Sequence, residues 1–271
     1  MTGTAAAGRV ADLAGAEYRR RRSGAHRVVV RTVTTFDVPG LDDALAIPGI
    51  PREYRSLLES LRAGMSSTTE GEQDGAGNRR RTVVLDATPD RRAMSCVLVD
   101  HGGKGFYSRD GVRFGVIGST APPAETEQAL TMIDDLEVEE ATVDDGPAGR
   151  GMTATLAEKD ITRIVDARRV LGSDIESTTT VGRIEIESDS ARVVVRLRAD
   201  FTAAHQMAGA IAVRSETVAT YTELPGEAGI EAPRLSMSMP EIGGIREAFR
   251  LSTPRGARAT KGGKSRARRR R

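Results

Sequence analysis

The stretch Thr179–Phe201, TTVGRIEIESDSARVVVRLRADF, contains two short runs in which apolar and charged residues alternate. The apolar positions share one parity within each run and are Ile184 and Ile186, then Val193, Val195 and Leu197. Such alternation is typical of strands with one buried face, and the intervening SDS predicts a β-hairpin. A loop of two or four residues within 187–191 makes the isoleucines face the valines and the glutamates face the arginines. One face must therefore be covered, while the other stays in water.

The composition indicates a folded protein with an aliphatic core. Apolar residues make up 38% of the 271 residues and charged residues 29%, while aromatic residues account for 3% and tryptophan is absent. A core of valine, isoleucine, leucine and alanine suits a sheet better than an aromatic binding site. The single cysteine, Cys96, stands between apolar neighbours, so we expect a buried thiol. No disulfide can form within one chain.

The spacing of apolar residues predicts further helices and strands. We expect helices over 5–22, 51–65, 124–136 and 158–172, and strands over 27–36, 81–87, 93–100, 105–110, 112–117 and 214–224. A second hairpin is expected over 136–157, a polar and glycine-rich loop over 66–78, and either helix or loop over 202–213. The turns TPDRR and HGGK are too short to connect parallel strands, so this part should be an antiparallel meander.

The predicted order of elements indicates the α+β class, because the helices interrupt the strands without alternating with them. We expect a curved antiparallel sheet, forming a half-barrel, with short helices packed in its concave face. Residues 1–233 should form this single domain. Residues 234–252 should form an extension with a short helix over 245–251, and residues 253–271 a disordered basic tail.

Positive charge is concentrated in the tail. Residues 255–271 hold nine Lys or Arg and no acid, whereas residues 1–254 carry 31 basic against 38 acidic side chains. Flexible basic segments bind nucleic acid or anionic membranes by releasing counterions. The polyanion-binding candidates are Arg258, Lys261, Lys264, Arg266, Arg268, Arg269, Arg270 and Arg271. One hypothesis is therefore a cytoplasmic adaptor that docks through this tail, and the alternative is a solubilising extension.

Several segments occur in the order found in a known protein family. These segments are SGAHRVVVRTVTTFDVPG, GKGFYSRDGVRFGV, GMTATLAEKDITRIV, the hairpin quoted above and TYTELPGEAGIEAP. They resemble the LppX and LprG group of mycobacterial lipoproteins, which are relatives of the LolA lipoprotein carriers. The resemblance covers about Val10–Pro233 and implies a half-barrel sheet with helices in its concave side. It also implies a cavity for acyl chains or glycolipids.

The N-terminal residues differ from those of this group, whose members begin with an export signal and a lipidated cysteine. MTGTAAAGRVADLAG has neither a leading positive cluster nor an apolar core, and Cys96 lies too far into the chain to be lipidated there. No run of about 18 apolar residues predicts a membrane span. We therefore expect a cytoplasmic location, or the cell envelope if an export segment precedes Met1.

No pattern of residues predicts catalysis or a cofactor. His26, His101 and His205 lie far apart, and none has a partner at the spacing of zinc ligands. With one cysteine and no GxSxG sequence, a nucleophile with its base cannot be assigned. The sequence thus favours a non-enzymatic binding protein without a cofactor over an enzyme.

The main functional hypothesis is a lipid or acyl-chain ligand held between sheet and helices. The predicted ligand-binding residues are Ile184, Ile186, Val193, Val195 and Leu197 on the sheet, facing Leu57, Leu58 and Leu61 on the helix over 51–65. A closed, dry core is the alternative for the same residues. The sequence leaves the oligomeric state open.

Overall fold

The computed structural model describes residues 2–5, 8–87, 93–118, 130, 132–147, 149–157, 160–161, 175–205, 209–224 and 229–235. Its strands are β1 (Thr2–Ala5), β2 (Gly8–Arg9), β3 (His26–Asp37), β4 (Met65–Gln73), β5 (Arg79–Leu85), β6 (Met94–His101), β7 (Lys104–Ser108), β8 (Gly115–Gly118), β9 (Glu137–Gly146), β10 (Gly149–Leu156), β11 (Ile175–Ser188), β12 (Arg192–His205) and β13 (Gly209–Glu223). Its helices are α1 (Val10–Leu13), α2 (Ala16–Ser23), α3 (Leu41–Ala46), α4 (Arg52–Ala63) and the 3-10 turn η1 (Ile133–Asp135).

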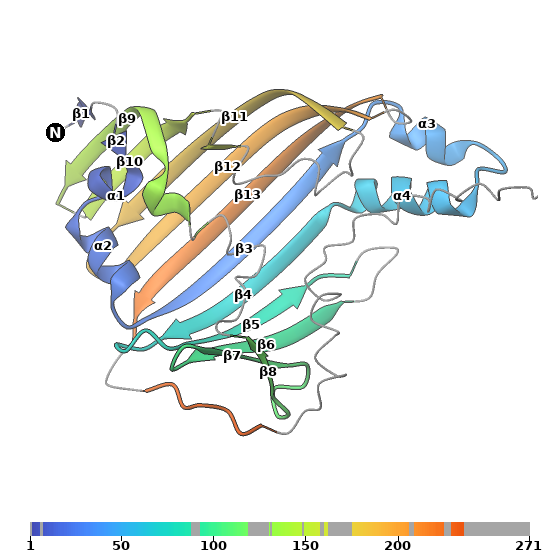
Figure 1. Cartoon of the computed structure of the whole chain (residues 1–271). Coiled ribbons are helices and arrows are strands. Elements are labelled where there is room, and N and C mark those ends of the chain that lie inside the picture. Colours follow the sequence, from blue (N-terminus) through green and yellow to red (C-terminus); the bar gives the residue numbers. More distant parts are fainter. Residues whose placement is uncertain are drawn as a thin grey trace, which may run out of the picture.

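These strands form one curved, antiparallel sheet (Figure 1). Their order across the sheet is β1-β9-β10-β11-β12-β13-β3-β4-β5-β6-β7-β8, and β2 also pairs with β9. α1 and α2 pack on the concave side over β9 to β13, while α4 contacts β3. The predicted α+β class is confirmed, with a meander over β5 to β8 and short helices against an antiparallel sheet. Within the described ranges, no helix combines the length and apolarity that a bilayer span requires.

The hairpin of β11 and β12 has the predicted register. Ile184 pairs with Leu197 and Ile186 with Val195, and the Asp189 amide donates to the Arg192 carbonyl across the turn at 3.0 Å. Ile184, Ile186, Val193, Val195 and Leu197, the five apolar residues predicted to face inward, are at most 3% exposed. The opposite face carries charge, since β11 and β12 are joined there by ion pairs such as Arg196 with Glu187.

One large hydrophobic cluster fills the space between this part of the sheet and α1, α2 and η1. It comprises Val10, Ala14, Tyr18, Val30, Leu130, Ile133, Leu136, Val138, Ala141, Met152, Ala154, Leu156, Ile161, Ile184, Ile186, Val193, Val195, Leu197, Ala199, Ala219 and Tyr221. We call it the aliphatic cluster. Burial of apolar area on this scale is the main favourable contribution to folding.

The predicted helix over 5–22 was wrong in its extent. The chain begins with strands β1 and β2, and the remaining helix is broken into α1 and α2. The break occurs at Gly15, whose φ of 91° favours glycine. A Cβ there would also lie 2.9 Å from the side chain of Arg150. Arg150 donates two hydrogen bonds to the Leu13 carbonyl, at 2.8 and 3.1 Å, and thereby satisfies the end of α1.

The predicted loop over 66–78 was also wrong, because most of it forms β4. This strand pairs with β3 on one side and β5 on the other, so its backbone groups are satisfied despite polar side chains. Ser67 and Thr69 are buried on its inner face. The segment 202–213 was expected to be helix or loop, whereas β12 extends to His205 and β13 begins at Gly209.

Other predictions fall only partly within the described residues. The hairpin over 136–157 is confirmed as β9 and β10. Of the predicted helices over 124–136 and 158–172, the structure describes η1 and a few neighbouring residues. The predicted helix over 245–251 and the basic tail lie outside the described residues. α3, which was not predicted, precedes α4.

Candidate ligand-binding pocket

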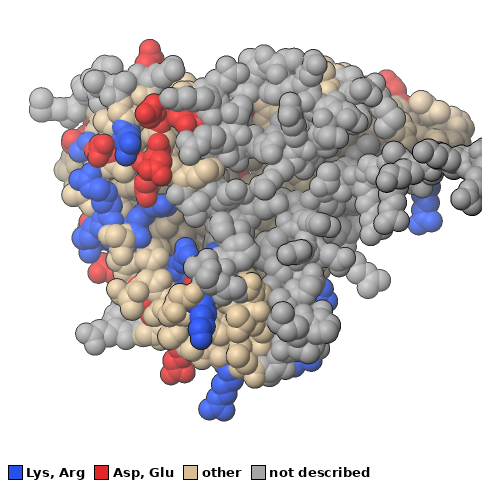
Figure 2. Space-filling view, viewed as in Figure 1, with Lys and Arg blue, Asp and Glu red and all other residues tan. Residues whose placement is uncertain are grey.

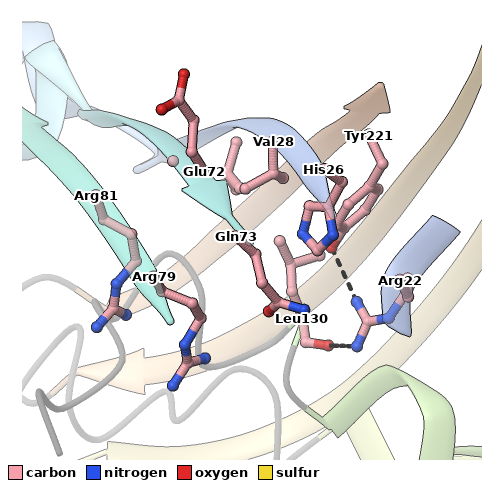
Figure 3. A pocket seen from close by; sticks show the side chains of 11 residues that line it. Arg22, His26, Val28, Glu72, Gln73, Arg79, Arg81, Leu130 and Tyr221 are labelled. Carbon is pink, nitrogen blue, oxygen red and sulfur yellow. Dashed lines mark hydrogen bonds between the residues drawn. The ribbon is translucent and has the colours of Figure 1, made fainter. Parts of the chain in front are cut away.

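A pocket of about 120 Å³ lies on the concave face, where the end of α2 meets β3, β4, β5 and β13 (Figure 3). It is lined by Arg22, His26, Val28, Val30, Gly71, Glu72, Gln73, Arg79, Arg81, Leu130 and Tyr221. Apolar and cationic side chains therefore share one small space.

Strand register places two rows of lining residues side by side. The first row runs from His26 through Gln73 to Arg79, and on to Asp100 of β6. In a sheet, residues directly opposite one another lie on the same face. The second row is the neighbouring set of positions on the same face, two residues away from the first row on each strand. From β13 to β6 it consists of Tyr221, Val28, Gly71, Arg81 and Leu98.

Gly71 keeps the floor of the pocket open. A Cβ at this position would lie 3.1 Å from Cγ of Arg81 and 3.3 Å from Cγ1 of Val28, closer than usual carbon contacts. The absence of a side chain therefore lets the stem of Arg81 cross the strand. A larger residue at position 71 would fill the same space.

Two arginines of β5 share one carboxylate. Asp100 Oδ2 accepts a hydrogen bond from Arg81 Nη2 at 2.9 Å and lies 3.2 Å from Arg79 Nη2. The Arg81 side chain is 4% exposed, whereas that of Arg79 is 39% exposed. The Arg79 guanidinium is thus the more accessible of the two to solvent.

Arg22 enters the pocket from the end of α2. Its guanidinium donates to Tyr221 Oη at 2.8 Å, to the Leu130 carbonyl at 3.0 Å and to Asp134 Oδ2 at 3.1 Å. It also lies 5.7 Å from the ring centre of Tyr18 and 5.5 Å from that of Tyr221, within cation–π range. These contacts hold Arg22 in one position.

Tyr18 and His26 are neutral neighbours of these cations. Burial raises the pKa of Tyr18 well above its usual range, so its hydroxyl stays protonated and donates to Asp134 at 2.6 Å. Burial also lowers the pKa of His26, an effect that the charge of Arg22 increases and the hydrogen bond to Gly24 opposes. The His26 ring makes an edge contact with the Tyr221 ring, at 5.3 Å between centroids.

Among the described residues that line the pocket, three are arginines and one, Glu72, is acidic, and the Glu72 side chain points away from the pocket (Figure 3). Asp134 pairs with Arg22, and Asp100 pairs with Arg79 and Arg81. Arg79 and Arg81 lie on one side and Arg22 on the other, with Gln73 between them. In the space-filling view, Lys and Arg side chains gather over the α2 side of this face (Figure 2).

The predicted ligand-binding residues lie elsewhere. The five on β11 and β12 belong to the aliphatic cluster, and none of them lines either pocket described here. Leu58 and Leu61 are buried on α4 and are not members of that cluster in the part of the chain described, while the Leu57 side chain lies outside the described residues. The polyanion-binding candidates in the tail lie outside the described residues too.

A second and larger pocket, of about 420 Å³, lies at residues of β3, β11, β12 and β13. It is lined by Thr35, Phe36, Asp37, Val181, Asp200, Phe201, Thr202, Ala212, Val213 and Arg214. The lining includes the buried Phe201 and Val213 as well as the exposed Asp200 and Arg214, so it involves both faces of these strands. An exposed ion pair of Arg214 with Asp200, at 2.8 Å, occupies its outer side.

The described residues show no group of three or more His, Cys, Asp or Glu that could hold a metal ion. Cys96 is buried, and burial raises the pKa of its thiol to about 11, which makes it a poor nucleophile at neutral pH.

Comparison with known proteins gives a coarse likeness in structure. No family model matches the chain, and no curated protein matches it. Among solved structures, LprF from Mycobacterium bovis is similar over 82% of this chain and 95% of its own, with 13% identity and a TM-score of 0.33. A DUF1329 family protein from Desulfovibrio piger is similar over 81% and 92%, with 11% identity and a TM-score of 0.27. Because these scores are low, the fold assignment rests on the strand pairing itself, and we draw no function from either protein.

Proposed function

We propose that the protein is a non-enzymatic binding protein that holds a lipid or acyl chain on the concave face of its sheet. The observation that carries this proposal is the continuity of the pocket with the aliphatic cluster. Val30, Leu130 and Tyr221 belong to both. A ligand in the pocket therefore has apolar side chains on one side and hydrogen-bond donors on the other, as small-molecule sites commonly do.

The volume sets a limit on what the pocket holds in this conformation. Its 120 Å³ is smaller than the roughly 300–1,000 Å³ of typical ligand sites. One end of a lipid fits this space, whereas a whole acyl chain does not. We infer that the packing around Leu130 opens when a long chain binds, which requires a ligand with higher affinity for the open state.

Lipid uptake by the full-length protein tests the proposal. The purified protein is incubated with a fluorescent fatty acid, and binding is followed by fluorescence and by native mass spectrometry. Gly71→Val should fill the floor of the pocket and reduce uptake by about tenfold or more. Gly75→Val is the matched control, because a Cβ at Gly75 meets nothing within 4 Å.

Circular dichroism confirms that both variants are folded before uptake is compared. A protein that never retains or takes up a lipid contradicts the proposal. Equal uptake by the two glycine variants shows that this pocket is not the site.

The hypothesis that the tail docks on polyanions stays a prediction, since the residues from 236 onward lie outside the described part of the chain. Truncation at Thr253 should abolish binding to nucleic acid and to anionic vesicles. Unchanged binding after truncation would remove the hypothesis.

A further inference from the structure

We propose that the pocket recognises the oxyanion headgroup of an amphiphilic ligand, a carboxylate or a phosphate, through the guanidinium groups of Arg22, Arg79 and Arg81. This inference rests on the proposed function and specifies the chemical class of the ligand. All three line the pocket, and Figure 3 shows Arg79 and Arg81 on one side of it and Arg22 on the other.

The first argument is the gathering of cations at the pocket. Asp134 faces Arg22, and a single oxygen of Asp100 faces both arginines of β5. Three guanidinium groups therefore lie around one partly buried space, where hydrogen bonds are stronger than in water. An oxyanion in this space accepts charge-assisted hydrogen bonds from guanidinium groups, which is a reason for selectivity toward anionic ligands.

The second argument is the freedom of Arg79. Its contact with Asp100 is longer than that of Arg81, and its side chain is the most exposed of the three guanidinium groups. It can therefore turn toward an incoming anion while Arg81 keeps Asp100 occupied. A guanidinium group can donate two parallel hydrogen bonds to a carboxylate or phosphate.

The third argument concerns the polar group between the cations. The Gln73 amide lies between Arg79 and Arg22, and its Nε2 donates to the Gly24 carbonyl over a long 3.4 Å. A bond of this length is weak. Gln73 is therefore a further donor that an oxyanion in the pocket can recruit at little cost.

The fourth argument sets the orientation of the ligand. Val28, Val30 and Leu130 form the apolar part of the lining, and two of them also belong to the aliphatic cluster. An anionic head near β5 would therefore have its first methylene groups against these side chains. Free phosphate has the same oxyanion chemistry but would leave the apolar part unused, so we favour an amphiphile.

The experiment compares ligands that share a chain and differ in the head. Calorimetry or displacement of a fluorescent fatty acid gives the affinities of the full-length protein for oleate, oleyl alcohol and inorganic phosphate. A hydrogen bond to a charged group corresponds to about ten- to hundredfold in affinity. We expect oleate to bind at least about tenfold more tightly than oleyl alcohol, and phosphate to bind weakly.

Two arginine variants locate the effect. Arg79→Gln should weaken oleate binding by about tenfold and leave oleyl alcohol almost unchanged. Arg80→Gln is the matched control, since Arg80 is the next residue of β5, is exposed and points to the opposite face. It removes the same net charge from the protein and should not change either affinity.

The outcomes separate this inference from the proposed function. Equal binding of oleate and oleyl alcohol overturns the anionic head while the lipid-binding function stands. Phosphate binding as tightly as oleate overturns the amphiphile, and equal losses in the two arginine variants overturn the site. If neither oleate nor the alcohol binds, both proposals fail. The comparison of ligands uses the unmodified protein, so it does not depend on the folding of a variant.

Discussion

The two halves of the concave face obey the same strand parity but carry different side chains. Over β9 to β13 the inward positions are aliphatic and closed over by α1, α2 and η1. Over β3 to β5 the inward positions include Thr69, Gln73, Arg79 and Arg81, and a pocket remains. We call the region over β9 to β13 the dry half and the region over β3 to β5 the polar half, although Val83 and Leu85 of β5 also face inward, in a smaller hydrophobic cluster.

The comparison separates stability from recognition. Buried apolar area stabilises a fold by about 25 cal/mol per Å². Buried ion pairs contribute little net stability because desolvation offsets their attraction, but removing one partner is costly. We therefore expect substitutions in the aliphatic cluster to change the free energy of unfolding and substitutions at the pocket to change the affinity for ligands.

The largest expected effect comes from Ile184→Ala. Ile184 is fully buried opposite Leu197, so truncation should lower the free energy of unfolding by about 2–5 kcal/mol, measured by urea denaturation. Ile47→Ala, directly after α3, is the matched control, because Ile47 is 54% exposed and should cost under about 1 kcal/mol. A small loss at Ile184 together with greater lipid uptake would show that this half is a ligand cavity after all, as the sequence had suggested.

Tyr18→Phe should have the next largest effect. The Tyr18 hydroxyl donates to Asp134 at 2.6 Å and connects α2 with η1, and a hydrogen bond to a charged group contributes about 1.5–3 kcal/mol. Thermal or urea unfolding measures the loss. The same substitution in an Asp134→Asn background completes a double-mutant cycle. Additive losses in that cycle would mean that Tyr18 and Asp134 have no interaction energy, so that this hydrogen bond does not stabilise the packing of α2 and η1 over β9 to β13.

The dry half could be predicted from the sequence because its pattern is local. Alternation in Thr179–Phe201 fixed the faces of β11 and β12, and the turn fixed their register. The break between α1 and α2 could not be predicted in this way. It depends on Arg150, a residue 137 positions beyond the Leu13 carbonyl that it binds.

The polar half could not be recognised, since β4 lacks the aliphatic alternation that marks a half-buried strand. Without β4, the row that brings Gln73 beside Arg79 does not exist. One signal was present in RRRTVVL at 79–85, where Arg79 and Arg81 share parity with the buried Val83 and Leu85. Two arginines on the inward face of a strand indicate an unusual site, although the pairing partners come only from the structure.

The free energy of unfolding should depend on pH through His26, which lies where the two halves meet. Because burial lowers the pKa of His26, the unfolded chain binds the proton at a higher pH than the folded protein. The contribution of neutral His26 to the free energy of unfolding is therefore fully present above about pH 6.5, the pKa of the unfolded state. It is lost as the pH falls from there through the pKa of the folded state. The slope for one proton cannot exceed about 1.4 kcal/mol per pH unit.

Urea denaturation of the wild type and of His26→Gln between pH 5 and 7 measures this contribution. The variant should lose part of the slope. An identical slope in the two proteins would show that His26 is not held neutral at the edge of the aliphatic cluster.

The smallest effect is expected on the convex face, where Arg196→Gln removes the ion pair with Glu187 at 2.8 Å. Both side chains are exposed, so the loss should be about 0.2–1 kcal/mol in urea denaturation at low salt. It should shrink further in 1 M salt, where charges are screened over about 3 Å. Glu187→Gln serves as the reciprocal control and should cost about the same. A loss of free energy of unfolding above about 2 kcal/mol that salt does not reduce would mean that this ion pair is buried. The convex face would then be covered as well, and the contrast with the concave face would not hold.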